Sequence, residues 1–153
     1  MAASSKGTLS AREAIHVSGK APSPLGSYSH AVKAGDFLFL SGQGARNPDS
    51  GLEEGVTLDA SGKLISYDID VQTRAVMRNM IVVLKAGDCD LKDLVDVSVF
   101  LADINDFSRF NQIYAEYMNF DGPPARTTVQ AAALPGKNFI EIKAVAFCPQ
   151  RKE

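Results

Sequence analysis

The chain has 153 residues, of which 45% are hydrophobic and 22% charged, and its formal net charge is −2. This length and composition predict one globular domain with a sizeable core. No apolar run approaches the roughly 18 residues that a membrane-spanning helix needs, and the charge gives no basic face for nucleic-acid binding.

The cysteine and histidine counts argue against a cross-linked or metal-bound fold. Cys89 and Cys148 are too few for a disulfide framework and lack the spacing of metal ligands. His16 and His30 are the only histidines, so a structural zinc site is not expected. We predict that both cysteines are buried or idle thiols in a reducing compartment.

The first 22 residues are small and polar and contain no apolar core of a secretory signal. We expect a flexible N-terminal tail over residues 1–22 and a single domain over residues 23–150. The alternative for the tail, a transit peptide, stays open. We predict a cytoplasmic protein.

The first half of the domain reads as two hairpins and a helix. Residues 28–42 alternate in polarity around an Ala-Gly-Asp turn, and a short second hairpin is predicted around Ser61 and Gly62. Asp68 or Asp70 can cap a helix that runs to about Ala86 and ends at Gly87. Its apolar stripe is Ile69, Val76, Met80, Val83 and Leu84.

A strand, a second helix and two closing strands follow. Residues 94–102 form a strand, and Asn105 or Asp106 then caps a helix with an aromatic stripe that belongs to the core. The inward positions of the strand are Val95, Val97, Val99 and Leu101. The helical stripe is Phe107, Phe110, Tyr114, Tyr117 and Met118.

The closing strands carry charges among apolar residues. In residues 139–147, one face is apolar, while the other sets Glu141 and Lys143 between large apolar side chains. Arg126 holds the corresponding place in residues 122–130. Charges so placed are costly to bury unless they are paired or used, so we predict a small site for an anionic molecule.

The order of elements predicts an α+β fold with two helices on one face of a mixed sheet. The second face then carries both charged and apolar residues, which suit neither open water nor a dry core. We expect this face to pack against another copy of the chain, with a wet cleft at the seam.

Five segments, taken together, resemble the RidA family of reactive intermediate deaminases, from about Pro24 to Phe147. The segments are GSYSHAV, LFLSGQ, LVDVSVFLADINDFSRFNQIYAEYM, GPPARTTVQ and IEIKAVA. The resemblance implies a chorismate-mutase-like α+β subunit in a homotrimer whose sheets form a central barrel. It also implies active sites in clefts between subunits and neither metal nor organic cofactor. Within the family, FDGPPARTT and IEIKAVA look most like 2-aminomuconate deaminases.

The resemblance assigns roles to four residues. Arg126 matches the arginine that binds the substrate carboxylate, and Glu141 matches the glutamate that positions or activates the attacking water. Tyr28 matches an aromatic residue that lines the pocket. Gly42 matches a glycine whose backbone N–H meets the carboxylate, where a missing Cβ lets the ligand approach closely.

Four positions depart from the family pattern, and one of them is Ser27, which replaces a common proline. Lys143 replaces the usual second acid of the closing strand, and we expect this cation to lower the pKa of Glu141. His30 replaces a glutamine, and Thr128 replaces a frequent cysteine. These changes bear on the substrate range and leave Arg126 and Glu141 in place.

The function that follows is hydrolysis of 2-aminomuconate, as its imine tautomer, to the 2-oxo dicarboxylic acid and ammonia in aromatic-compound catabolism. A dicarboxylate needs a second anion site, for which Arg46 is the candidate, assisted by Lys143 or His30. Each has a plainer alternative role. Arg46 would be a solvated loop residue, His30 a satisfied core or interface residue, and Lys143 a partner of Glu141 or of an acid at an interface.

Two other functions stay open. One is a general deaminase of 2-imino acids and enamines, and the other is a non-catalytic protein that binds small acids through Arg126. A ribonuclease is disfavoured by the sequence pI of about 5.7 and the two histidines.

Overall fold

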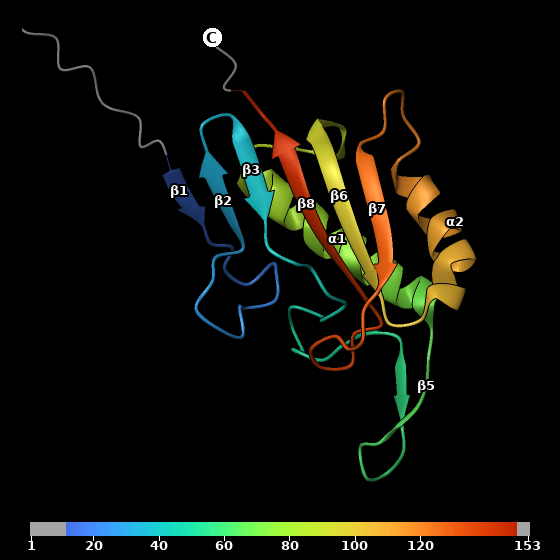
Figure 1. The fold of residues 1–153 in the computed structure, drawn as a ribbon. Helices are drawn as coiled ribbons and strands as arrows, with labels where there is room; N and C mark the ends of the chain where they lie inside the picture. Colours follow the sequence, from blue (N-terminus) through green and yellow to red (C-terminus); the bar gives the residue numbers. More distant parts are fainter. Residues whose placement is uncertain (1–11, 150–153) are drawn as a thin grey trace, which may run out of the picture.

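The computed structural model of the protein describes residues 12–149, which form a curved sheet with two helices packed on one side (Figure 1). The strands are β1 Arg12–Ile15, β2 Ala31–Ala34, β3 Phe37–Leu40, β4 Val56–Leu58, β5 Leu64–Tyr67, β6 Leu94–Leu101, β7 Ala125–Gln130 and β8 Ile140–Phe147. The α-helices are α1 Ile69–Ala86 and α2 Phe107–Tyr117, and the 3₁₀ turns are η1 Leu91–Asp93 and η2 Ile104–Asp106. The predicted α+β class is confirmed.

The main sheet has the strand order β1-β2-β3-β8-β6-β7, in which β6 and β7 are parallel and all other neighbours antiparallel. Helices α1 and α2 cover one side, here called the helix face, and the opposite side is called the open face (Figure 1). Strands β4 and β5 form a separate ribbon. Within residues 12–149, no helix is long and apolar enough to cross a bilayer.

Helix α1 follows its predicted pattern. The Asp68 side chain accepts hydrogen bonds from the N–H groups of Asp70 and Val71, and the whole predicted apolar stripe is buried. The helix ends at Gly87 as expected, but Gly87 has φ −95°, and the left-handed residue is Asp88 at φ 60°. Gly87 is required for another reason: a Cβ there would lie 2.5 Å from a Leu38 methyl group.

Strand β6 departs from simple alternation at its start. Val97, Val99 and Leu101 are buried as predicted, whereas Val95 is 42% exposed and Leu94 is buried instead. The pairing of β6 with β8 shifts register between Leu94 and Asp96. This bulge inserts an extra residue and turns Val95 outward, so its predicted inward position is wrong.

The second helix begins directly after Asp106, as predicted, but without a side-chain cap. A 3₁₀ turn precedes it, and the Asp103 side chain caps that turn by accepting from the Asn105 N–H. Asp106, one of the predicted caps, makes no capping bond to α2. Its carboxylate instead accepts a 2.7 Å hydrogen bond from the Tyr67 hydroxyl. Burial, together with this hydrogen bond, raises the pKa of Tyr67 to about 12.

The sheet begins inside the range predicted as an N-terminal tail. Residues 12–15 pair with β2 as an edge strand, and Ile15 joins the core. The predicted domain boundary at residue 23 therefore moves to Arg12 for the described chain. The rest of the predicted tail, residues 1–11, lies outside the described residues.

The two cysteines form a disulfide, which corrects the prediction of free thiols. Cys89 lies in the turn after α1 and Cys148 directly after β8, with their Cα atoms 5.9 Å apart. Because α1 packs on β8 and β3, its last turn comes close to the end of β8. The 59 residues that separate the cysteines in sequence hide this proximity.

Core and surface follow the two faces of the sheet. Alternate residues of β8 point to the helix face and are buried, as predicted: Ile140, Ile142, Ala144 and Ala146. The open face carries half-exposed large apolar side chains, among them Phe37, Phe39 and Phe147, each 42% exposed. The Phe37 ring lies next to the other two, with centroid distances of 6.4 Å to Phe39 on β3 and 5.2 Å to Phe147 on β8, so the three form an apolar patch.

Candidate active site

The end of β3 brings a glycine against a carboxylate. Beyond Leu40 the chain continues through Ser41 and Gly42, and Gln43 pairs with Ile142 of β8 by two backbone hydrogen bonds of 2.8 and 3.0 Å. A Cβ at position 42 would lie 1.9 Å from Oε1 of Glu141. Only glycine therefore fits beside the Glu141 carboxylate as it stands.

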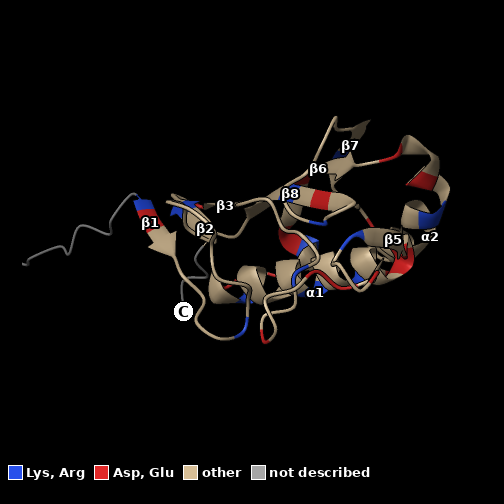
Figure 2. Cartoon of the chain, turned by 90° about the horizontal axis from the view of Figure 1, so that it is seen from below, with Lys and Arg blue, Asp and Glu red and all other residues tan. Residues whose placement is uncertain are grey.

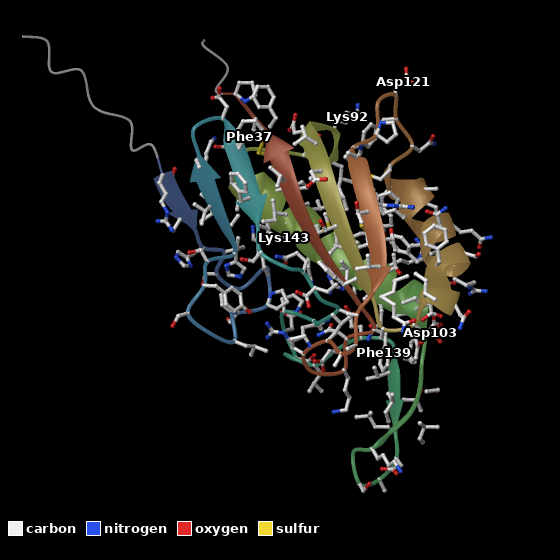
Figure 3. All side chains as sticks on the ribbon, viewed as in Figure 1. Phe37, Lys92, Asp103, Asp121, Phe139 and Lys143 are labelled. Atoms are coloured by element: carbon white, nitrogen blue, oxygen red, sulfur yellow. A yellow bond between two sulfur atoms is a disulfide. The ribbon has the colours of Figure 1, made fainter. Side chains whose placement is uncertain are left out.

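Glu141 is half-buried, and burial raises the pKa of its carboxyl group. No described residue forms a salt bridge or hydrogen bond with this carboxylate. Lys143 instead donates a 3.2 Å hydrogen bond from Nζ to the Leu40 carbonyl oxygen. Figure 3 labels Lys143 where it points from β8 towards β3. The expectation that Lys143 lowers the pKa of Glu141 is wrong, because the ammonium group is turned to the backbone.

A small polar recess beside Gly42 gathers four of the predicted site residues. Its lining includes Tyr28, His30, Gly42 and Arg46, together with Pro22, Ser41, Gln43, Gly44 and Asn79. The recess has a volume of about 30 Å³. That space holds about one water molecule, whereas ligand pockets usually measure about 300–1,000 Å³. A single chain therefore offers only one wall of a substrate site here.

The side chains of His30 and Arg46 form hydrogen bonds with backbone groups. Nδ1 of His30 accepts from the Val17 N–H at 3.1 Å, and Nε2 donates to the Pro22 carbonyl at 2.9 Å, so the ring is a neutral tautomer. Arg46 donates from Nη2 to the Ser23 carbonyl at 2.7 Å, which leaves its other N–H groups available. The structure thus gives His30 a structural role at the recess.

The recess depends on a residue that sequence reasoning missed. Asn79 lies inside α1, is 1% exposed, and donates from Nδ2 to the carbonyls of Gly44 and Arg46, both at 2.9 Å. One side chain thus fixes both ends of a short loop segment. A polar residue between the apolar positions Val76 and Met80 was the signal available in the sequence.

Arg126 lies over the aromatic side chains of α2. The centre of its guanidinium group is 5.7, 5.3 and 4.8 Å from the ring centroids of Phe107, Phe110 and Tyr114. It has no acidic partner among residues 12–149, which leaves its five N–H donors for an anion. The stripe predicted as core therefore also forms a platform for this arginine.

The structure does not bring Arg126 and Glu141 together within one chain. Arg126 pairs with Val97 and points to the helix face, whereas Glu141 pairs with Phe100 and points to the open face. Strand β6 separates them. A small acid cannot touch both side chains in the same subunit because the sheet lies between them.

The other features of the described chain lie away from these residues. A larger hollow of about 340 Å³ lies at the C-terminal ends of α1 and α2, and it contains none of the predicted site residues. Among residues 12–149, the one cluster of potential metal ligands is Cys89, Asp93 and Cys148. Acidic and basic positions are interspersed along the ribbon, without a uniformly basic element (Figure 2).

Comparison with known proteins identifies the family. A sequence model of the family described as endoribonuclease L-PSP matches residues 18–148. A human protein named 2-iminobutanoate/2-iminopropanoate deaminase is 40% identical over 130 residues, which are 84% of this chain and 85% of the human protein. The chain belongs to the RidA family.

Two further proteins are similar to this chain, one in sequence and one in fold. Reactive Intermediate Deaminase A of Arabidopsis thaliana chloroplasts is 41% identical over 128 residues, covering 83% of this chain and 62% of the plant protein. The crystal structure of E. coli TdcF with bound serine has a TM-score of 0.75 at 28% identity, covering 88% of this chain and 98% of TdcF. The predicted RidA resemblance is confirmed at the level of the family.

Proposed function

We propose that this protein is a cofactor-independent deaminase that hydrolyses 2-imino acids to 2-oxo acids and ammonia. One observation carries the proposal: within residues 12–149, the chain has both a guanidinium group without an acidic partner, Arg126 on the helix face, and a half-buried carboxylate without a partner, Glu141 on the open face. The first suits a substrate carboxylate, and the second suits a water molecule. The names of the human and Arabidopsis relatives support this reaction class.

The site is completed between subunits of a homotrimer. Arg126 of one subunit and Glu141 of the next line one cleft, and the open faces of the three sheets meet as a central barrel. Three observations support this arrangement: the opposite orientations of the two side chains, the recess of only about 30 Å³, and the exposed apolar patch on the open face.

The reaction then proceeds in two steps. Arg126 holds the substrate carboxylate by two parallel N–H···O bonds and fixes the imine carbon near Glu141. Glu141 takes a proton from water as its oxygen adds to this carbon, and passes that proton to the imine nitrogen, which gives a carbinolamine. Glu141 then carries the proton of the carbinolamine hydroxyl group to the nitrogen, the C–N bond breaks, and ammonia leaves as the carbonyl forms. The raised pKa of Glu141 suits a group that both accepts and returns a proton.

The substrate range follows from the recess at Gly42. A simple 2-imino acid needs only the Arg126 and Glu141 walls, and the relatives' names point to such substrates. 2-Aminomuconate is the narrower hypothesis, in which Arg46 holds the second carboxylate. Arg46 and Lys143 each make one hydrogen bond to a backbone carbonyl and keep further N–H donors for this role, whereas His30 has no free ring nitrogen.

A second candidate function is a non-catalytic protein that binds small acids through Arg126. The Glu141 carboxylate argues against it, because an unpaired, half-buried carboxylate beside an anionic ligand would weaken binding. The endoribonuclease name of the family model finds little support in this chain, whose net charge is −2.

Ammonia release from freshly generated 2-iminopropanoate and 2-aminomuconate tests the function. We expect turnover of 2-iminopropanoate, with a loss in kcat/KM of about 10- to 100-fold in Arg126→Lys, which keeps the charge and loses the planar fork. Binding of 2-oxo acids without turnover of either imine would establish the non-catalytic alternative. We expect Arg46→Ala to weaken the turnover of 2-aminomuconate and not that of 2-iminopropanoate, because only aminomuconate needs the second anion site.

Mixing two inactive variants tests the shared site. Arg126→Ala and Glu141→Gln each remove one wall, but a mixed trimer contains one cleft with an intact Arg126 and an intact Glu141. Equal random mixing makes about three quarters of the trimers mixed, each with one intact site of three, so roughly a quarter of the activity returns. If mixing restores nothing after verified subunit exchange, both residues act within one subunit.

A further inference from the structure

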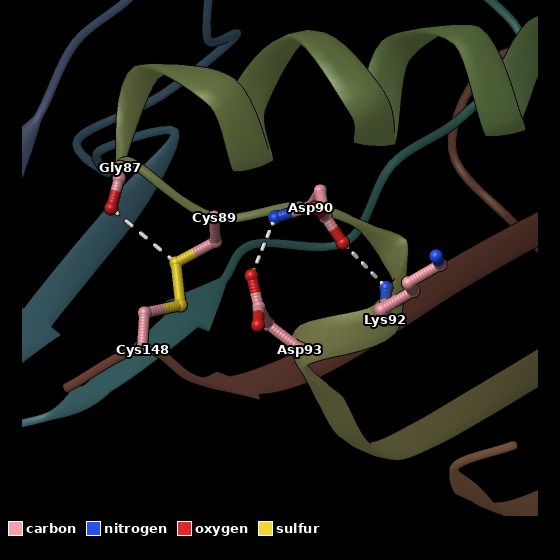
Figure 4. The surroundings of a disulfide bond; sticks show 6 residues. All are labelled: Gly87, Cys89, Asp90, Lys92, Asp93 and Cys148. Atoms are coloured by element: carbon pink, nitrogen blue, oxygen red, sulfur yellow. Dashed lines mark hydrogen bonds between the residues drawn. A yellow bond between two sulfur atoms is a disulfide. The ribbon is translucent and has the colours of Figure 1, made fainter. Parts of the chain in front are cut away.

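The disulfide region holds a group of atoms that the deaminase function does not use. Sγ of Cys89, Sγ of Cys148 and a carboxylate oxygen of Asp93 all lie within 4.8 Å of one another (Figure 4). Both cysteines are more than nine-tenths buried, at 5% and 7% exposed. Cys148 directly follows β8 and Cys89 lies in the turn after α1, while Glu141 lies near the beginning of β8.

We propose that Cys89, Cys148 and Asp93 form a zinc site when the disulfide is reduced. Reduction by a dithiol or a phosphine adds two electrons and two protons and breaks the S–S bond to give two thiols. A Zn²⁺ ion then displaces one proton from each thiol and binds two thiolates and one carboxylate. Zinc favours this mixture of sulfur and oxygen ligands, with a fourth position left for water.

The distances suit this exchange. Zinc binds sulfur at about 2.3 Å and carboxylate oxygen at about 2.0 Å in a tetrahedron, which places the ligand atoms roughly 3.5–3.8 Å apart. The cluster already lies within 4.8 Å, so side-chain rotations after reduction suffice. No backbone rearrangement is needed for the three ligands to meet.

The third ligand is held in position by its neighbours. The backbone N–H of Asp90 donates a 2.8 Å hydrogen bond to Oδ2 of Asp93, and Oδ1 of Asp90 in turn accepts from the Lys92 N–H at 2.7 Å (Figure 4). This reciprocal capping fixes the Asp93 carboxylate and leaves its second oxygen for a metal ion. Support of this kind is typical of metal ligands in proteins.

The charge around the cluster favours a cation. Asp88 and Asp90 flank Cys89 directly in sequence, and Asp93 follows three residues later, so this turn carries three acids against the single base Lys92. Such a field attracts a divalent ion and opposes the anionic substrates proposed for the other site.

Cobalt titration of the reduced protein tests the proposal. The full chain is reduced with a phosphine under anaerobic conditions, freed of reductant, and titrated with Co²⁺. We expect thiolate-to-cobalt charge-transfer absorption that saturates at one ion per chain and is displaced by Zn²⁺. The oxidised protein gives no such band. Absence of the band in the fully reduced chain would overturn the proposal.

Variants test whether Asp93 acts as a metal ligand or only adds negative charge near the cluster. Cys148→Ser abolishes the band. Asp93→Asn keeps an acceptor for the Asp90 N–H but binds cobalt at least about tenfold more weakly, since even supporting residues around metal ligands contribute about 10- to 100-fold. The control Asp88→Asn removes an exposed acid outside the cluster and leaves the affinity close to wild type. Equal affinities for Asp93→Asn and wild type would remove Asp93 from the site.

A further measurement uses only the wild-type chain, so it does not depend on whether the variants fold. Zn²⁺ slows alkylation of both cysteines in the reduced protein, while Mg²⁺, which prefers oxygen ligands, does not. Alkylation at the same rate with and without Zn²⁺ contradicts the proposal. Deaminase activity enters neither readout, so failure of this site and failure of the proposed function are independent results.

Discussion

At the scale of single residues, Glu141 combines a cost in stability with the catalytic role that we propose for it. Burial raises the pKa of its carboxyl group above the ordinary value of 4.5. The folded chain therefore binds a proton at pH values where the unfolded chain has released it, and stability falls as pH rises through this window. The ionised carboxylate is tolerated because it sits in the candidate site.

The variant Glu141→Gln tests the effect of this carboxylate on stability and on catalysis separately. At pH 7 we expect a higher midpoint of thermal unfolding than wild type, because the buried charge is gone, and no difference well below pH 4.5. We expect kcat/KM to fall by about 10²- to 10⁴-fold. In the wild type, kcat/KM declines with acid through a pKa above 4.5. A less stable variant at pH 7 would show that an attractive contact, rather than burial, governs this carboxylate.

At the scale of elements, the loop after β3 depends on α1. The Asn79 amide bridges the carbonyls of Gly44 and Arg46 and so couples the recess wall to the helix. The Arg78–Glu54 ion pair adds a second link, as one hydrogen bond joins Arg78 to the same Arg46 carbonyl. A substitution inside α1 should therefore act on the substrate site without touching substrate.

Asn79→Ala measures this coupling. It removes the side-chain donor of the Gly44 carbonyl and leaves the Arg46 carbonyl with only the longer bond from Arg78. We expect a loss of about 1–3 kcal/mol in the free energy of unfolding, measured by urea titration. We also expect a higher KM for aminomuconate, because Arg46 loses its support. The control Thr73→Ala removes a buried hydroxyl that bonds only the Ile69 carbonyl within the same helix. Equal effects on KM for the two variants would refute a specific link to the recess.

At the scale of the whole molecule, the open face is the surface through which we propose that three copies assemble. Phe39 lies in its apolar patch and is 42% exposed in the single chain, so a charged residue there leaves the core intact but opposes packing between copies. We expect Phe39→Lys to shift the protein from trimer to monomer in light scattering and to lose activity with the shared site. Leu52→Lys, in an exposed loop at 69% exposure, serves as the control and stays trimeric.

The sequence predicts local structure far better than it predicts which residues meet. Alternation in β8 and the capped stripe of α1 follow from short-range periodicity, and both are confirmed. The bulge at Val95 depends on the partner strand, and the Cys89–Cys148 contact depends on where α1 ends above β8. The opposite directions of Arg126 and Glu141 follow only from the register of three strands.

The position of β8 has a consequence for the order of folding. It is the last strand in sequence, yet it lies between β3 and β6 in the middle of the sheet. During synthesis, β1 to β3 and β6 with β7 can pair only as two separate halves until residues 140–147 leave the ribosome. Both halves expose strand edges in that interval, so the nascent chain is open to wrong pairing until its final strand closes the sheet.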